Sequence, residues 1–363
     1  MKRVLIIANT YYQMILSIQM RLTVFNGDEV VLLLSDQSNN AYEIVQKLRT
    51  EQVFHQTAYV KLKGLIRGRK KLDKLKDFAD IAFGSSNRYS LYLEAVEDPC
   101  FDELICYNYN IDIIGLYSLL CKYNRQVKVS LFEEGVLSYG IRFESNFRRE
   151  LIGFFRKLQG KKDISEAFYR FYCYYPQLYY GPLETMRVPP ISMECECTEV
   201  LRCVFNIDRE KLSYPQKYIY FSSVCDFAGG APIGELELVK RIAEMIGRDK
   251  LIIKAHPRDA RGVYEREGLT VDRNSSIPWE AIQLSGDFSD KVFLTATSGS
   301  VLSASFMTDT PPKTFFMYKL CNIEGNEFAT QSASDIDSLL HTECVKGILS
   351  KVRIIDSLEE IIG

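Results

Sequence analysis

Short, mostly apolar runs alternate with amphipathic segments along this chain, and the alternation restarts after an irregular middle. In the first half the runs lie at 2–9, 28–36, 102–108 and 127–135, with amphipathic segments at 10–25, 40–50 and 111–123. In the second half the runs lie at 217–223, 250–257, 290–298 and 310–318, with an amphipathic segment at 234–247. Continuous rather than alternating apolar residues are typical of parallel strands buried on both faces. We therefore predict an α/β protein with two Rossmann-like, doubly wound domains.

The irregular middle marks the expected domain boundary. It is basic and then aromatic over 145–182, and no strong period holds from Arg187 to about Gln216. A chain of 363 residues has the length of two ordinary domains. We expect an N-terminal domain at 1–195, a C-terminal domain at 216–345 and a terminal helix at 346–363.

Composition and charge argue against several classes of protein. The net charge of −2 gives no general attraction for nucleic acid. No window approaches the roughly 18 apolar residues of a membrane span, and the apolar run from Val4 to Ala8 is too short for a signal peptide. We expect a cytoplasmic protein whose ten scattered cysteines are reduced thiols. Because Asp335-Ile-Asp337 opens a predicted helix instead of closing a strand, we predict no metal ion and no other cofactor.

A histidine ends one of the predicted strands in the second half. In LIIKAHPRDA, His256 follows the strand, with Lys254 before it and Pro257 after it. Ligands of open α/β sheets bind outside the carboxyl ends of the strands. An imidazole there, with a pKa of about 6.5, can donate a proton or a hydrogen bond to a leaving phosphate. The simpler interpretation is a packed or solvated histidine.

Hydroxyl residues and carboxylates follow other predicted strands. A turn of small residues that precedes a helix could hold a phosphate or carboxylate, or could simply cap that helix. This turn consists of Thr297, Ser298, Gly299 and Ser300. Ser222 lies at the end of the strand at 217–223, and Asp226 follows that strand. In the first half, Glu133, Glu134 and Gly135 close a strand. One of these carboxylates could act as a base or orient a sugar hydroxyl, although the pair could also form an ordinary charged turn.

Together these short motifs resemble those of bacterial sialyltransferases, most closely the lipooligosaccharide and capsule sialyltransferases of glycosyltransferase family 52. The matching stretches are LIIKAHPRD at 251–259, SIPWEAI at 276–282, TATSGS at 295–300, EEG at 133–135, and Thr10-x-x-Gln13 after the first strand. The resemblance implies a GT-B-type fold, with the acceptor on the N-terminal domain and a nucleotide sugar on the C-terminal domain. It also implies an inverting, metal-independent transfer from CMP-sialic acid to a terminal galactoside of a capsule or lipooligosaccharide.

The resemblance also assigns roles to individual residues. His256 would assist departure of CMP, while Ser298, with Ser300 as a second candidate, would hold its phosphate. Glu280 of Pro-Trp-Glu would bind the ribose or the cytosine. Asp226 would deprotonate the acceptor, with Glu134 as the competing base. The sequence departs from the family in having Glu-Glu in the acidic motif, a serine pair split by Gly299, and a longer segment between Asp226 and His256.

Other functions and partners stay open at this point. The alternatives are a GT-B-type transferase or epimerase that uses another nucleotide sugar, and a non-catalytic glycan- or nucleotide-binding protein of capsule assembly. Three histidines are few for an epimerase. The basic segments 61–78 and 147–162 are either solvated surface or a peripheral contact with an anionic membrane that presents a lipid-linked acceptor. The aromatic residues at 168–180 pack in the core or at an interface, or stack on a sugar, and a homodimer is also left open.

Overall fold

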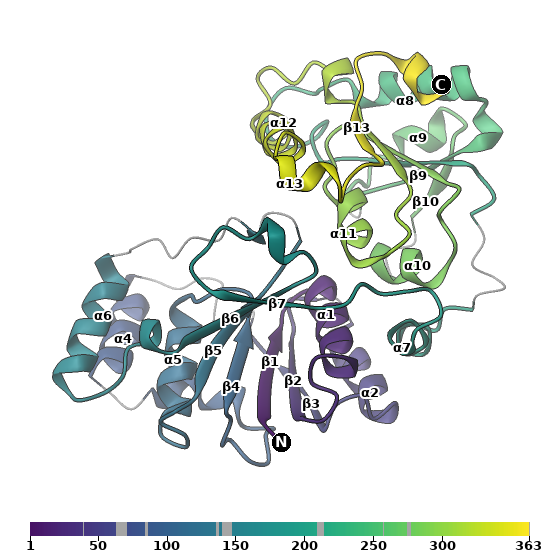
Figure 1. Cartoon of the computed structure of the whole chain (residues 1–363). Coiled ribbons are helices and arrows are strands. Elements are labelled where there is room, and N and C mark those ends of the chain that lie inside the picture. The colour runs from purple at the N-terminus through teal and green to yellow at the C-terminus, as the bar shows by residue number, and fades with distance from the viewer. Residues whose placement is uncertain are drawn as a thin grey trace. The chain divides into compact units, whose positions relative to one another are not determined.

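The computed structural model of the chain contains two parallel sheets, each in its own α/β domain (Figure 1). The structure describes residues 1–38, 40–62, 71–83, 86–135, 138–139, 147–208, 214–256, 258–273 and 277–362. Met1–Pro189 and Glu199–Asn206 form the N-terminal domain, and Pro190–Thr198 and Ile207–Gly363 form the C-terminal domain. The expected limits at 195 and 216 lie close to the region in which the chain passes from one domain to the other.

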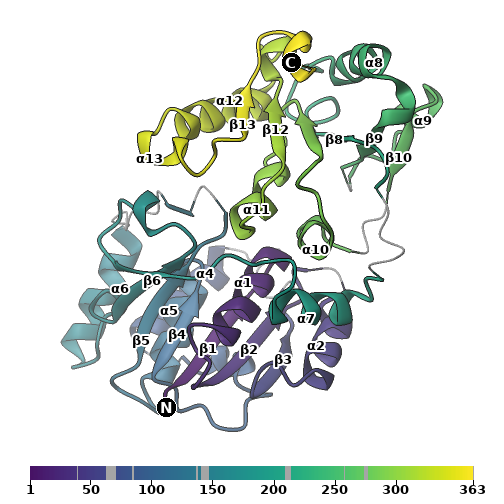
Figure 2. The same cartoon turned by 45° about the vertical axis from the view of Figure 1, so that its right-hand side comes forward.

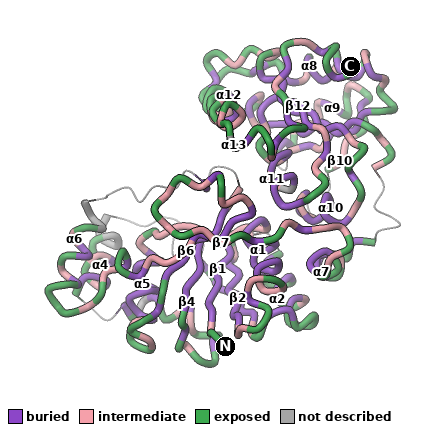
Figure 3. The backbone as a smooth tube through the Cα atoms, in the orientation of Figure 1, coloured by how far each residue is buried: buried purple, intermediate pink, exposed green. Residues whose placement is uncertain are grey.

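The N-terminal domain is built on a seven-stranded sheet of order β3-β2-β1-β4-β5-β6-β7, in which every neighbouring pair is parallel. Its strands are β1 (Arg3–Ala8), β2 (Glu29–Ser35), β3 (Gln56–Val60), β4 (Glu103–Cys106), β5 (Lys128–Phe132), β6 (Phe168–Cys173) and β7 (Glu184–Arg187). The central strands are buried along almost their whole length (Figure 3), which explains their continuous apolar sequences.

Helices cover both faces of this sheet, as the views in Figures 1 and 2 show. α1 (Tyr11–Leu22) and α2 (Ala41–Thr50) lie on one face, and α4 (Lys71–Ala82), α5 (Ile111–Leu120) and α6 (Phe147–Leu158) lie on the other. α1 begins where the Thr10 hydroxyl accepts a hydrogen bond from the Gln13 N–H. α7 (Glu196–Phe205) ends beside α2, where Lys47 Nζ donates to the Val204 carbonyl at 2.8 Å.

The C-terminal domain repeats this topology with a six-stranded parallel sheet of order β10-β9-β8-β11-β12-β13. Its strands are β8 (Tyr218–Phe221), β9 (Leu251–Lys254), β10 (Thr270–Asp272), β11 (Val292–Thr295), β12 (Lys313–Phe316) and β13 (Val352–Ile354). Its longer helices are α8 (Glu235–Ile246), α10 (Trp279–Ser285), α11 (Ser300–Met307) and α12 (Glu327–Leu340), and α9 (Val263–Arg266) and α13 (Glu343–Lys346) are single turns.

Both domains therefore have the strand order 3-2-1-4-5-6 of doubly wound nucleotide-binding sheets, and the N-terminal sheet adds a seventh strand. The predicted fold class, an α/β protein of two Rossmann-like, doubly wound domains, is confirmed. In each sheet the direction of winding reverses beside the first strand, between β1 and β4 and between β8 and β11. Such a switch point is where ligands bind in folds of this class.

The expectation of a terminal helix at 346–363 is wrong. Residues Val352–Ile354 form β13, which pairs with β12, and Leu358–Ile361 form a 3-10 turn. The helical periodicity of this segment is interrupted at Ser357, whose capping box with Glu360 starts a new turn. None of the helices in the described part of the chain is both long enough and apolar enough to span a bilayer.

Candidate functional site

Three neighbouring strands of the C-terminal sheet end side by side at its switch point. Phe221 of β8 is in register with Lys254 of β9 and with Thr295 of β11, and adjacent strands lie about 4.8 Å apart. The residues that follow these strands therefore meet at one edge. Two contacts tie the segments together: the His256 N–H donates to Ser222 Oγ at 2.8 Å, and Cys225 Sγ lies 3.4 Å from Thr297 Oγ1.

The backbone around His256 selects one form of its ring. The Arg258 N–H donates to His256 Nδ1 at 3.1 Å, so Nδ1 acts as an acceptor and the ring proton resides on Nε2. Burial, and then the positive charge of Arg258, lower the pKa of His256 below its ordinary value. The half-buried ring is thus a neutral hydrogen-bond donor through Nε2 at physiological pH. Pro257 lies outside the described residues.

The turn before α11 has the features of an anion-binding site. The Ser298 N–H donates to Thr295 Oγ1 at 2.8 Å, which fixes the turn to the end of β11. The hydroxyls of Ser298 and Ser300 lie 2.7 Å apart at the start of the helix. Apart from Gly299 and its two neighbours in the chain, no described residue has an atom within 4 Å of the point where a Cβ on Gly299 would be, so there is space beside this turn. Two hydroxyls and the first N–H groups of α11 can therefore face a ligand phosphate.

The side chain of Asp226 is occupied by hydrogen bonds within the protein. Its Oδ1 accepts the Ile233 and Gly234 N–H groups at 2.9 and 3.1 Å, and its Oδ2 accepts the Glu235 N–H at 3.1 Å. These donors form the N-terminal end of α8, so Asp226 serves as its cap. An acceptor hydroxyl would have to compete with three backbone donors for this carboxylate. The geometry therefore argues against the role of base that the resemblance gave it.

Of three other candidates from the sequence, two have partners within the protein. Ser222 is buried between His256 and the end of β9, where its N–H donates to the Lys254 carbonyl at 3.1 Å. Lys254 Nζ forms an ion pair with Asp272 of β10 at 2.8 Å. Glu280 lies in the first turn of α10, where burial raises the pKa of its carboxyl group. Of these three, only Glu280 has no side-chain hydrogen bond or ion pair to another of the described residues.

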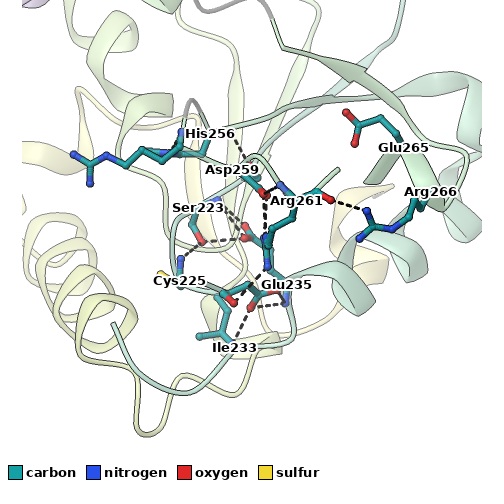
Figure 4. Close-up of polar contacts among 12 residues, drawn as sticks. Ser223, Cys225, Ile233, Glu235, His256, Asp259, Arg261, Glu265 and Arg266 are labelled. Carbon is teal, nitrogen blue, oxygen red and sulfur yellow. Dashed lines mark hydrogen bonds and ion pairs between the residues drawn. The ribbon is translucent and has the colours of Figure 1, made fainter. Parts of the chain in front are cut away.

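The loop after β9 is anchored by a pair of residues that the sequence analysis did not single out. Arg261 Nε and Nη2 donate to the two carboxylate oxygens of Asp259, each at 2.9 Å (Figure 4). The same guanidinium donates to the Asp226 carbonyl at 3.4 Å and lies 4.7 Å from the centre of the Phe227 ring. Arg261 thus joins the loop that carries His256 to the loop after β8. The signal in the sequence was the Asp-x-Arg that directly follows His-Pro-Arg.

A buried carboxylate stands behind this part of the site. Glu235 accepts hydrogen bonds from the Ser223 N–H and hydroxyl, each at 3.0 Å (Figure 4). It also accepts a hydrogen bond from Tyr220 Oη at 3.0 Å. Burial raises the pKa of Glu235 to about 7. Its contacts fix the first residues after β8, although Glu235 has no exposed surface itself. Glu235 therefore supports the loop after β8. The sequence analysis did not identify it, because it lies among the other charged residues of the helix segment at 234–247.

The two glutamates after β5 in the N-terminal domain lie in different environments. Glu133 is fully buried and accepts hydrogen bonds from the hydroxyls of Tyr12 and Tyr139 and, at 2.9 Å, from the Tyr174 N–H. Burial raises the pKa of Glu133 to about 7. With both oxygens bound, Glu133 holds α1 and β6 to the end of β5. It is therefore a structural residue rather than a substrate ligand.

Glu134 is half-buried and faces the start of α1. Burial raises the pKa of Glu134 above its ordinary value, and polar contacts with the side chains of Thr10 and Gln13 offset part of the rise. Gln13 is itself held by the Asn9 N–H, which donates to its Oε1 at 2.6 Å. Gly135 has a φ of +76°, the left-handed conformation that glycine favours, and so turns the chain after Glu134. The structure thus brings the side chains of Thr10, Gln13 and Glu134 together.

Comparisons with known proteins give weak similarities only. No protein-family model matches the sequence, and a search of curated protein sequences finds no significant match. An α/β-galactoside α-2,3-sialyltransferase from Photobacterium phosphoreum is similar at 10% identity and a TM-score of 0.49, over 99% of this chain and 100% of that chain. MurG from Acinetobacter baumannii is 9% identical with a TM-score of 0.43, over 100% of this chain and 90% of that chain. UGT89C1 from Arabidopsis thaliana, complexed with UDP, is 13% identical with a TM-score of 0.44, over 97% and 94%. The strand orders of the two sheets, and not these similarities, establish the fold.

Proposed function

We propose that this chain is an inverting glycosyltransferase that moves sialic acid from CMP-sialic acid to a terminal galactoside of a bacterial surface glycan, such as a capsule or lipooligosaccharide. The observation that supports it most is the pairing, at the C-terminal switch point, of a neutral imidazole donor with an open, hydroxyl-lined helix N-terminus. That combination suits a leaving group that departs as a phosphate monoester. The motifs shared with sialyltransferases supply the choice of CMP-sialic acid as the donor.

The proposed chemistry needs two groups. As the bond between the anomeric carbon and the phosphate oxygen of CMP breaks, negative charge grows on that phosphate. His256 Nε2–H and the Ser298 and Ser300 hydroxyls donate hydrogen bonds to it, and the α11 dipole favours the charge. In this proposal these groups, rather than a metal ion, neutralise the departing CMP. Glu280 is assigned to the ribose or the cytosine.

The acceptor hydroxyl attacks the anomeric carbon and gives up its proton to a carboxylate, which we assign to Glu134. Its environment supports this choice over Asp226. Glu134 is partly exposed and has a raised pKa, which makes its carboxylate a better proton acceptor. Thr10 and Gln13 would orient the carboxylate from the start of α1.

Thermal shift with nucleotides is the first test of the donor. Wild-type protein is melted with CMP, CMP-sialic acid, UDP, UDP-sugars and GDP-sugars. A ligand bound only by the folded state stabilises it by about 2.7 kcal/mol at a hundredfold excess over the dissociation constant. We expect a shift with CMP compounds alone. We expect Ser298→Ala to lose this shift and Ser334→Ala, an exposed serine on α12, to keep it. A shift with UDP or GDP compounds instead would reject the sialyl donor but leave a transferase of another nucleotide sugar.

Release of CMP in the presence of a galactoside acceptor tests catalysis separately. We expect His256→Ala to reduce the thermal shift with CMP but not to abolish it, because the Ser298 and Ser300 hydroxyls remain. The same variant should lower kcat by about 100-fold or more, since a positioned acid or hydrogen-bond donor contributes on that scale. Binding of CMP by wild type without turnover on any galactoside would favour the non-catalytic alternative.

A further inference from the structure

The outer faces of α4 and α6 carry apolar side chains where solvent-facing helices are normally polar. On α4, Leu75 and Ala79 are exposed, and Phe83, the residue directly after the helix, continues the same line. Residues four apart share one face of a helix. Leu75 is 59% exposed and Phe83 is 54% exposed. On the opposite face of α4, Asp77 and Ile81 are buried, so the exposed line is not the face that packs against the rest of the domain.

A matching pair of residues lies on α6. Phe154 and Leu158 follow each other at a spacing of four and are 56% and 68% exposed. The two helices pack together, and Phe155 connects their exposed lines: its ring centre lies 4.6 Å from that of Phe83 and 5.6 Å from that of Phe154. We call Leu75, Ala79, Phe83, Phe154 and Leu158 the α4–α6 surface.

Basic residues accompany this surface. Lys76 is exposed beside Leu75, and Lys157 is exposed beside Leu158, where it forms an ion pair with Glu166 at 3.0 Å. Lys161 and Lys162 lie in the turn after α6, beyond Gln159 and Gly160. Partial burial, and then the charges of Arg156 and Lys122, lower the pKa of Lys161.

We propose that the α4–α6 surface docks onto a lipid bilayer that contains anionic headgroups. Exposed Phe and Leu side chains would enter the boundary between headgroups and acyl chains, while the lysines would reach the phosphates. Positive charge at the edge of an apolar surface is complementary to an anionic membrane. Neither helix is long enough to cross it, so the domain would lie on the membrane surface. This inference rests on surface exposure and charge alone and is independent of the proposed transferase activity.

Flotation of the full chain with lipid vesicles tests the proposal. Vesicles of phosphatidylcholine mixed with phosphatidylglycerol are compared with vesicles of phosphatidylcholine alone. We expect binding to the anionic vesicles, weakened but not abolished by 1 M salt, because salt at this concentration shortens the screening length to about 3 Å and leaves the apolar contact. Equal partitioning into both kinds of vesicle, or no binding to either, would overturn the proposal.

Two sets of substitutions locate the contact. The combined variant Leu75→Ser, Phe83→Ser, Phe154→Ser and Leu158→Ser should lower the partition coefficient by at least about a hundredfold. Its control, Tyr42→Ser with Ile362→Ser, removes side chains that are 59% and 61% exposed elsewhere and should bind as wild type does. Glutamine at Lys76, Lys157, Lys161 and Lys162 should weaken binding about fivefold for each charge. Glutamine at Lys313, Lys319, Lys346 and Lys351 changes the net charge equally and should have a much smaller effect.

A protein partner is the competing occupant of this surface. Light scattering of the lipid-free protein would reveal a homodimer, and the serine variant would then become monomeric. That result, or vesicle binding that survives all four serine substitutions in a variant with an unchanged melting curve, would contradict membrane docking by this surface.

Discussion

At the scale of single residues, one backbone contact decides what His256 offers to a ligand. Because the Arg258 N–H occupies Nδ1, the ring presents a proton at Nε2 without needing a positive charge. A neutral donor keeps its proton above the ordinary histidine pKa, so it serves a phosphate throughout the neutral range. The sequence predicted the position of this histidine from the end of an apolar run. It could not predict the tautomer, since the donor is a main-chain group of the following loop.

The two candidate bases can be separated by matched substitutions. Glu134→Gln should lower kcat by about 100-fold or more and leave both the nucleotide thermal shift and the melting temperature nearly unchanged. Asp226→Asn should lower the free energy of unfolding by about 1 kcal/mol, because it weakens the cap of α8, while kcat stays close to that of wild type. Steady-state kinetics and denaturant titration measure the two effects. A large loss of kcat in Asp226→Asn, with full activity in Glu134→Gln, would reverse our assignment.

At the scale of elements, Asn326 connects a helix start to the loop beside the candidate site. Its Nδ2 donates to the carbonyls of Cys225 and Ala231, each at 2.8 Å, and its Oδ1 accepts the Ala329 N–H at 3.0 Å. We expect Asn326→Ala to lower the free energy of unfolding by about 2–4 kcal/mol, since it leaves buried carbonyls unsatisfied and removes the cap of α12. Denaturant titration measures this loss.

Asn110→Ala is the matched control for that prediction. Asn110 caps α5 in the other domain through the Asp112 and Ile113 N–H groups, at 3.0 and 3.1 Å. It should cost only about 1 kcal/mol, as an ordinary N-cap does. Equal losses for Asn326→Ala and Asn110→Ala would show that the contacts of Asn326 with the loop contribute little.

The strands that the sequence analysis did not predict are mainly those at the edges of the sheets. β3 and β7 end the N-terminal sheet, and β10 and β13 end the C-terminal sheet. Edge strands are short and partly solvated, so Glu184–Arg187 and Thr270–Asp272 carry polar residues and have no continuous apolar run. Central strands such as β2 and β8 have such runs, and these were recognised. Sequence therefore predicted the middle of each sheet, where the switch points lie.

The positions of several candidate site residues were also predictable, because these residues follow strands with continuous apolar runs. His256, Ser298 and Glu134 follow central strands, as the apolar runs predicted, while their roles stay predictions. Asp226 and Glu133 were chosen for their carboxylates, but their partners are distant in sequence or are main-chain groups, as with Tyr174 and the start of α8. Whether a carboxylate binds a ligand or the protein itself depends on such partners, which no local pattern shows.

At the scale of the whole molecule, each domain has a buried glutamate beside the end of a central strand. Glu133 directly follows β5, and Glu235, at the start of α8, contacts residues at the end of β8. Burial raises the pKa of Glu133 and of Glu235 from 4.5 to about 7. Tyrosine hydroxyls bind both carboxyl groups, Tyr12 and Tyr139 in one domain and Tyr220 in the other. Each side chain links the end of a strand to a neighbouring element, so the protonation of these two groups affects the stability of both domains.

These two glutamates predict how stability depends on pH. A raised pKa means that the folded state holds the proton more tightly than the unfolded chain does. Their stabilising effect is therefore complete below about pH 4.5 and is lost as the pH rises through about 7, by up to about 3 kcal/mol for each group. We expect Glu133→Gln and Glu235→Gln each to flatten the fall in unfolding free energy between about pH 5 and about pH 8. Glu343→Gln, an exposed position, should not. The lowered pKa of His256 has the opposite effect, because it reduces the free energy of unfolding as the pH falls below about 6.5. This contribution is the same in wild type and in each variant, so it cancels in the comparison. Denaturant titrations across this range decide the matter, and equal slopes in wild type and both variants would show that neither carboxyl group releases its proton near pH 7.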